Sequence, residues 1–263
     1  MTVSKTSQAV AMTRSGFARP HSAQGDPLAQ QRLCAGMNTV VLTHMLASLA
    51  ARTAFFDGQV TSAIEAGVDQ IVILGAGYDD RALRFRSSGV TFFEVDHSGT
   101  QTDKRMRLDA ILAEDEPASD APRPVLVAAD FGSDDVAAVL RAAGHDRQRV
   151  TLFICEGLLV YLDRPTTVRF LSGVRSAAAH DSLLAASLSV HADGLDSATV
   201  VARGNARRRT AEAEPWQTIL PVSGQIALLA SAGWDVAATV DAADLGTGAE
   251  PGRSLLVTAA PAG

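Results

Sequence analysis

The sequence has few cysteines and no excess of positive charge. Only Cys34 and Cys155 occur in 263 residues, and no cluster of cysteine and histidine has the spacing of a zinc site, so no metal is predicted. Two widely separated thiols indicate buried free cysteines, which are typical of a reducing cytoplasm. With 23 Lys and Arg against 29 Asp and Glu, the net charge is −6. The chain therefore lacks the basic surface of a nucleic-acid-binding protein.

Long apolar runs are also missing. No run reaches the ~18 residues that a membrane-spanning helix needs, and the first residues lack the apolar segment of a secretory signal. We therefore expect a cytoplasmic protein without a membrane partner. The hydrophobic share of 47% and the charged share of 20% are those of an ordinary globular protein, and 263 residues are enough for a sizeable core.

The most informative stretch that is present covers residues 70–85, QIVILGAGYDDRALRF. Residues 71–74 are apolar and rich in β-branched side chains, which predicts a buried strand. The turn Gly75-Ala76-Gly77 follows, and a helical pattern comes after it. A strand, a glycine turn and a helix bring the backbone close to a nucleotide-like ligand. Gly75 allows the sharp turn, and Gly77 removes the side chain where the ligand must approach.

The residues after this turn favour one class of ligand. A dinucleotide-binding loop has glycine or alanine where this chain has Asp80, which is preceded by Asp79. Two carboxylates repel a pyrophosphate but tolerate a cationic ligand. S-adenosylmethionine has no phosphate and carries a sulfonium and an ammonium group. The loop therefore favours S-adenosylmethionine over NAD.

The apolar pattern of the whole chain predicts an α/β fold. Helical patterns separate the first five of seven predicted strands, which indicates a mostly parallel sheet with helices on both faces and right-handed crossovers. The last two strands are expected to pair like a hairpin at one sheet edge. The predicted strands cover residues 71–74, 90–95, 124–129, 150–155, 183–190, 234–240 and 254–259.

The residues before the first strand are expected to stand apart from this core. Residues 1–33 are polar and predict a mobile arm or a helical cap outside the core. Two helices are predicted over residues 37–51 and 59–66, the second ending at Gly67. We therefore divide the chain into an N-terminal arm and helical cap, residues 1–66, and a core, residues 67–263, within one compact domain.

Carboxylates follow the predicted strands at the edge where such sheets bind ligands. Asp96, at the tip of the second strand, suits ribose hydroxyls, and Glu94 on the same face is its competitor. Asp130 and Phe131 after the third strand suit the amine and the ring of an adenine, with a helix N-cap as the alternative for Asp130. Glu156 ends the fourth strand, where it can receive a ligand ammonium or a substrate group.

Four motifs, in order LGAGYDDRALRF, FFEVDHSGTQTDK, AADF and ICEGLLVYL, together resemble the leucine carboxyl methyltransferase family of S-adenosylmethionine-dependent enzymes. The chain is most similar to the bacterial branch, which includes tailoring enzymes of polyketide pathways. The resemblance is close over about residues 40–165 and elsewhere rests on strand count. It implies a Rossmann-like class I methyltransferase fold, and S-adenosylmethionine as the cofactor, which leaves as S-adenosylhomocysteine.

The resemblance also implies roles for individual residues. Arg52 would pair with the methionine carboxylate, although a surface pair with Asp57 is the alternative. The turn Gly75-Ala76-Gly77 would line the methionine portion, and the residues at the strand tips would keep the roles inferred above. Arg14 would match a basic residue of the N-terminal arm. The family often has a threonine in place of Asp80, which leaves that contact open.

Three residues are candidates for a catalytic role. His97 and His191 end strands at one edge, and either can act as a general base, with an exposed or hydrogen-bonded histidine as the alternative. Tyr161 either lines the acceptor cavity or packs against the next helix. A carboxylate acceptor needs no base because it is ionised at neutral pH, whereas a phenol, with a pKa of ~10, would benefit from one. Without an obvious base, the sequence favours O-methylation of a carboxylate, and the resemblance implies a small polyketide-like molecule as the acceptor.

Other functions stay open at this point. Methylation of a hydroxyl on an aromatic polyketide, a non-catalytic S-adenosyl-binding subunit and a nicotinamide oxidoreductase are the alternatives. The basic run at residues 207–209 is interpreted as a solvated surface or as a lid over an anionic substrate. The expected partner is a small-molecule acceptor. The oligomeric state is left open, a homodimer included.

Overall fold

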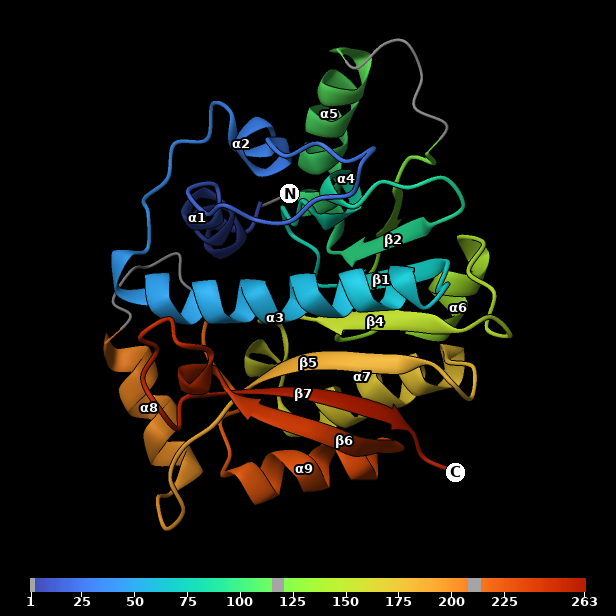
Figure 1. Ribbon diagram of the computed structural model, residues 1–263. Coiled ribbons are helices and arrows are strands. Elements are labelled where there is room, and N and C mark those ends of the chain that lie inside the picture. Colours follow the sequence, from blue (N-terminus) through green and yellow to red (C-terminus); the bar gives the residue numbers. More distant parts are fainter. Residues whose placement is uncertain (1–2, 115–120, 208–213) are drawn as a thin grey trace.

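The computed structural model describes residues 3–114, 121–207 and 214–263, and its centre is one seven-stranded sheet (Figure 1). The strand order is β3-β2-β1-β4-β5-β7-β6. The first five strands are parallel, and β7 lies antiparallel between β5 and β6. The strands are β1 (Gln70–Leu74), β2 (Thr91–Asp96), β3 (Val125–Ala128), β4 (Thr151–Cys155), β5 (Leu183–Ser189), β6 (Trp234–Asp241) and β7 (Ser254–Pro261). The predicted α/β fold, the strand count and the antiparallel pair at the edge are confirmed.

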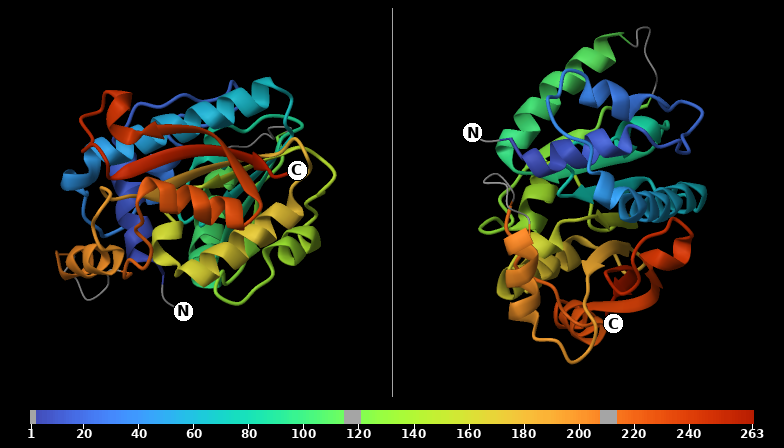
Figure 2. Two further views of the ribbon diagram at one scale, coloured as in Figure 1. Left: turned by 90° about the horizontal axis from the view of Figure 1, so that it is seen from below. Right: turned by 90° about the vertical axis from the view of Figure 1, so that its left-hand side faces the viewer.

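Helices cover both faces of the sheet (Figures 1 and 2). Alternate residues of β1 point to opposite faces, so Ile71 and Ile73 join one apolar cluster and Val72 and Leu74 join the other. The first cluster lies under α3 and the second under α6, α7 and α9. The α-helices are α1 (Lys5–Arg14), α2 (Ala29–Cys34), α3 (Leu46–Glu65), α4 (Arg81–Arg84), α5 (Ser98–Glu114), α6 (Val136–Ala142), α7 (Arg164–Ala177), α8 (Ser197–Arg207) and α9 (Val222–Ser231); single 3-10 turns are η1 (Thr43–Met45), η2 (Leu159–Tyr161) and η3 (Ala242–Leu245).

The order of the strands fixes where a ligand can bind. From β1 the chain proceeds outward through β2 to β3, and it then returns to place β4 on the other side of β1. Open α/β sheets bind their ligands at such a reversal, outside the carboxyl ends of the strands, which here are those of β1 and β4. The residues that follow β1, β2 and β4 meet at this edge.

One prediction about the helices before β1 is wrong. A single helix, α3, replaces the two helices expected over residues 37–51 and 59–66. The charged residues Arg52 and Asp57 indicated a break between two helices, but both side chains form buried or nearly buried ion pairs inside the fold. The helix ends as expected, because Gly67 follows it with φ +83°.

The N-terminal segment also contributes to the core, contrary to expectation. In α2, Ala29 and Leu33 are fully buried and pack with Leu83 and Leu108. Figures 1 and 2 show α2 beside α5, with α1 packed against α2 and α3. The polar composition of this segment hid the few apolar residues that form the contact. None of the helices in the described segments is long and apolar enough to cross a membrane.

Candidate active site

A buried network of arginines and carboxylates occupies the carboxyl edge beside β1 and β4. It joins the N-terminal segment, α3, the turn after β1 with α4, and the end of β4. None of its side chains is more than 13% exposed. Its members are Arg14, Arg19, Arg52, Arg81 and Arg84 with Asp57, Asp79, Asp80 and Glu156. We call these nine residues the arginine–carboxylate network.

Glu156 forms ion pairs with three arginines. Its Oε1 faces Arg52 Nε at 3.2 Å and pairs with Arg14, and its Oε2 lies 3.0 Å from Arg81 Nη1. Burial raises the pKa of Glu156, but the three arginines outweigh this effect and lower it to about 2. The carboxylate therefore stays ionised. The surface pair of Arg52 with Asp57 does not form, because Asp57 contacts other arginines.

The two aspartates after the glycine turn do not face a ligand as the sequence suggested. Asp79 Oδ2 lies 2.5 Å from Arg81 Nη1 and 3.6 Å from Arg14. Asp80 pairs with Arg84 at 3.0 Å and with Arg19. Because arginines neutralise both carboxylates, their charge cannot discriminate against a pyrophosphate. Contrary to the prediction, Asp79 and Asp80 therefore do not favour S-adenosylmethionine over NAD.

The turn after β1 requires both of its glycines. At Gly77, however, the reason is not the approach of a ligand, as was expected. Gly75 and Gly77 have φ values of +67° and +48°, which side chains rarely adopt. A Cβ on Gly77 would lie 2.8 Å from Cβ of Ser7 in α1. The space beside Gly77 was expected to admit the ligand, but Ser7 of α1 occupies that space. Ala76, between the glycines, is buried.

Replacement of Gly77 by alanine is expected to lower the free energy of unfolding by ~3 kcal/mol, because backbone strain and overpacking against Ser7 add together. Gly36→Ala is the matched control. Gly36 has φ +72° but nothing within 4 Å of an added Cβ, so strain alone should cost ~1 kcal/mol. Urea unfolding measures both. Equal losses in the two variants would mean that the contact with α1 does not exist.

Asp96 lies at the strand tip beside this turn, as predicted, whereas Glu94 is buried in an ion pair. Asp96 Oδ2 accepts from Gly77 N at 2.7 Å, and Oδ1 accepts from His97 N at 2.7 Å. Burial raises the pKa of Asp96, although these two N–H groups oppose the rise. Glu94 is only 1% exposed and lies 2.6 Å from Nζ of Lys104. Of the two residues, only Asp96 is partly exposed.

Asp130 and Phe131 follow β3 at the same edge. Asp130 is exposed, and its Oδ1 accepts from Gly132 N at 2.8 Å. The alternative interpretation of Asp130 as a helix N-cap is wrong, because Asp135 caps α6. Phe131 is half-buried and packs edge-on against Phe170, with ring centroids 4.8 Å apart.

The three catalytic candidates do not come together. His97 is exposed, and its Nδ1 lies 3.3 Å from Gly99 N. His191 is buried with both ring nitrogens hydrogen-bonded, one to Ser197 Oγ at 2.8 Å and the other to a backbone carbonyl. Two strands separate β2 from β5, so the histidines stand roughly 14 Å apart across the sheet. Tyr161 is half-buried in η2.

Several members of the network were not predicted from the sequence. Arg19, Arg81 and Arg84 were not singled out, Asp57 was named only as a surface partner of Arg52, and Arg14 was matched only to a basic residue of the N-terminal arm. The spacing of Asp80 and Arg84, four residues apart in DDRALRF, was the available signal for one pair. Of the basic run at residues 207–209, only Arg207 lies in the described part of the chain, where it is exposed at the end of α8.

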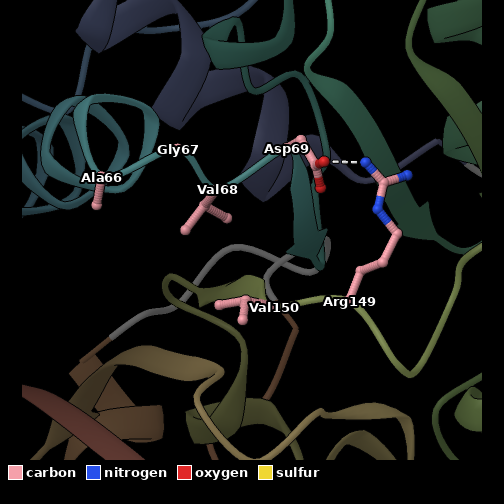
Figure 3. Close-up of a pocket in the computed structure, with 6 residues that line it drawn as sticks. All are labelled: Ala66, Gly67, Val68, Asp69, Arg149 and Val150. Carbon is pink, nitrogen blue, oxygen red and sulfur yellow. Dashed lines mark hydrogen bonds and ion pairs between the residues drawn. The ribbon is translucent and has the colours of Figure 1, made fainter.

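A cavity of ≈ 310 Å³ lies at the opposite edge of the sheet, near the amino ends of β1 and β4 (Figure 3). Asp69 and Arg149 form an ion pair at its rim, and both side chains are more than a third exposed. Its lining is Ala66, Gly67, Val68, Asp69, Arg149 and Val150. None of these residues belongs to the network or to the strand tips, so the cavity is separate from the candidate site.

The sheet order and the position of the site define a Rossmann-like class I methyltransferase fold. A provisionally assigned methyltransferase from Thermobifida fusca has the same fold, with a TM-score of 0.61, 17% identity, and coverage of 94% of this chain and 97% of that one. Magnesium protoporphyrin IX methyltransferase from Synechocystis, solved with S-adenosylhomocysteine, has a TM-score of 0.56 and 14% sequence identity. The match covers 88% of this chain and 92% of that one. The predicted fold class is confirmed.

The chain belongs to the leucine carboxyl methyltransferase family, whose model matches residues 9–175. A relative from Mycolicibacterium vanbaalenii is 36% identical over 160 residues, which are 60% of this chain and 52% of the relative. A relative from Parafrankia is 36% identical over 166 residues, which are 62% of this chain and 52% of that relative. Both are provisionally named S-adenosyl-L-methionine-dependent methyltransferases, which confirms the predicted cofactor for the family. The chain spans about half the length of these curated relatives.

Proposed function

We propose that this chain is an S-adenosylmethionine-dependent O-methyltransferase that acts on a carboxylate of a small, polyketide-like molecule. The observation that carries this proposal is the convergence of Arg14, Arg52 and Arg81 on Glu156 beside the glycine turn. These groups have the charges that an amino acid zwitterion requires. They lie at the carboxyl edge of the sheet, at the point where its strand order reverses.

Buried donors in this network support the fit of a ligand carboxylate. Among the described residues, Arg14 Nε and Arg81 Nη2 are buried without a hydrogen-bond partner. A buried donor left unpaired costs ~1–3 kcal/mol, and a ligand oxygen would remove that cost. Arginine also presents its donors as a planar fork that matches a carboxylate. The network therefore suits the methionine portion of the cofactor.

Binding would exchange partners within the network. The methionine carboxylate would pair with Arg14 and Arg52. Oε1 of Glu156 would then be free to accept a hydrogen bond from the methionine ammonium. Arg81 would remain on Oε2, 3.0 Å away, and keep Glu156 ionised. In this proposal residues 1–66 form the arm and cap, which supply Arg14 and Arg52, and residues 67–263 form the core.

The strand tips would hold the rest of the cofactor. Asp96 is fixed by two N–H groups and is partly exposed at the strand tip, so it is the better acceptor for ribose hydroxyls than the buried Glu94. Asp130 and Phe131 combine an exposed carboxylate with a half-buried ring at the end of β3. That pair suits the amine and the ring of adenine.

S-adenosylmethionine, when bound, supplies a methyl group on a positively charged sulfur. The chain would hold the acceptor oxygen in line with that methyl group and exclude water. A carboxylate acceptor arrives ionised and has no proton to lose. This choice is supported by His191, whose ring nitrogens are both engaged, and by His97, which is exposed.

The acceptor class can be tested with paired aromatic compounds. The purified chain is incubated with methyl-labelled S-adenosylmethionine and either 1-naphthoic acid or 1-naphthol. The proposal predicts label in the acid, recovered as volatile methanol after alkali, because esters hydrolyse under alkali and aryl ethers do not. Boiled protein is the control. Alkali-stable label from the naphthol alone would contradict carboxyl methylation and favour the hydroxyl alternative.

A further inference from the structure

A buried lysine links the glycine turn to β2. Lys104 of α5 and Glu94 of β2 are each 1% exposed, and Lys104 Nζ lies 2.6 Å from Glu94 Oε2. The same ammonium donates to the carbonyl oxygen of Asp79 at 2.7 Å. A buried ion pair loses much of its Coulomb energy to desolvation, and an apolar pair often packs as stably. Stability alone is therefore a poor reason for this arrangement.

Lys104 and Asp96 contact the two ends of residues 77–79. At the start of the turn, Gly77 N donates to Asp96 Oδ2 at 2.7 Å. At its end, the carbonyl of Asp79 accepts from Lys104. Asp96 and Glu94 are two residues apart on β2, so one strand anchors both ends of residues 77–79. Glu94 serves the lysine alone, since neither carboxylate oxygen accepts a hydrogen bond from any other described residue.

We propose that Lys104, anchored by Glu94, is a positioning residue for cofactor binding. It holds residues 77–79 so that Gly77 N keeps the Asp96 carboxylate in place at the strand tip. Lys104 contacts the turn through the carbonyl oxygen of Asp79, and no hydrogen bond or ion pair joins it to Asp96 among the described residues. This inference rests on the proposed function, because the ribose contact of Asp96 belongs to it.

Two variants separate positioning from stability. Lys104→Met removes the donor and leaves Glu94 buried without a cation. Glu94→Met combined with Lys104→Met removes both charges and keeps straight side chains of similar length. We expect the single variant to lose both thermal stability and about tenfold in affinity for S-adenosylmethionine. We expect the double variant to regain the stability but not the affinity, because the Asp79 carbonyl still lacks its donor.

The matched control is Arg105→Met, which removes one positive charge from an exposed position of the same helix and should change neither quantity. Calorimetric titration measures the affinity, and thermal unfolding measures the stability. If affinity recovered together with stability in the double variant, Lys104 would have only a structural role. An unchanged affinity in both variants would also overturn the inference.

Amide exchange of Gly77 tests the inference without any cofactor. In the free protein, the Gly77 N–H should exchange about tenfold faster in both lysine variants than in the wild type and in Arg105→Met. Unchanged exchange would overturn the positioning role. If the wild type failed to bind S-adenosylmethionine, the proposed function would fall, while Gly77 exchange would still decide whether Lys104 holds the turn.

Discussion

Glu156→Gln is expected to weaken the binding of S-adenosylmethionine about a hundredfold, or ~3 kcal/mol. The substitution keeps the size of the side chain but removes the one negative charge on which Arg14, Arg52 and Arg81 converge. The three guanidinium groups would then face one another with less compensation, and the methionine ammonium would lose its acceptor. Calorimetric titration of the folded variant measures this loss directly.

The control for this variant is Glu250→Gln. Glu250 also pairs with an arginine, Arg253, at 3.3 Å, but the two side chains are 79% and 64% exposed. Water screens such a pair, so this substitution should leave affinity unchanged. If Glu156→Gln bound S-adenosylmethionine as tightly as the control, Glu156 would not contact the cofactor.

Asp57→Asn is expected to lower the free energy of unfolding by ~3–5 kcal/mol. Asp57 is 1% exposed, and its Oδ1 lies 2.8 Å from Arg81 Nε and 2.7 Å from Arg84 Nη2. Arg19 Nε approaches the other oxygen at 3.6 Å. Asparagine has nearly the same shape, so the loss would come from three buried arginines that no longer share a carboxylate.

Asp69→Asn provides the comparison for that result. Asp69 pairs with Arg149 at the rim of the cavity in Figure 3, where both side chains are more than a third exposed. An exposed ion pair contributes ~0–1 kcal/mol. Urea unfolding of both variants tests the account, and equal losses would show that the network is not held together by its buried charges.

The sheet was predictable from sequence because each strand is a local signal. The apolar runs at residues 71–74 and 150–155 predict strands without knowledge of the neighbouring strands. Together they were enough to predict the parallel sheet and its carboxyl edge. The strand-tip residues Asp96 and Glu156 followed from that edge alone. Both lie where the pattern placed them.

The arginine–carboxylate network was not predictable in the same way, because its contacts are not local. Arg52 and Glu156 are 104 residues apart, and Arg81 and Glu156 are 75 apart. A charged side chain far from its partner resembles a solvated one, so Arg52 and Asp57 were interpreted as the end of a helix. The same limitation made Asp79 and Asp80 seem to face a ligand, although each has arginine partners.

The most direct test of the central claim is calorimetric titration of the purified chain with S-adenosylmethionine and, separately, with NADH. The account predicts saturable binding of S-adenosylmethionine alone. It further predicts that Asp96→Ala weakens this binding, because the substitution removes the carboxylate held by Gly77 N at the tip of β2. Binding of NADH in place of S-adenosylmethionine would contradict the account.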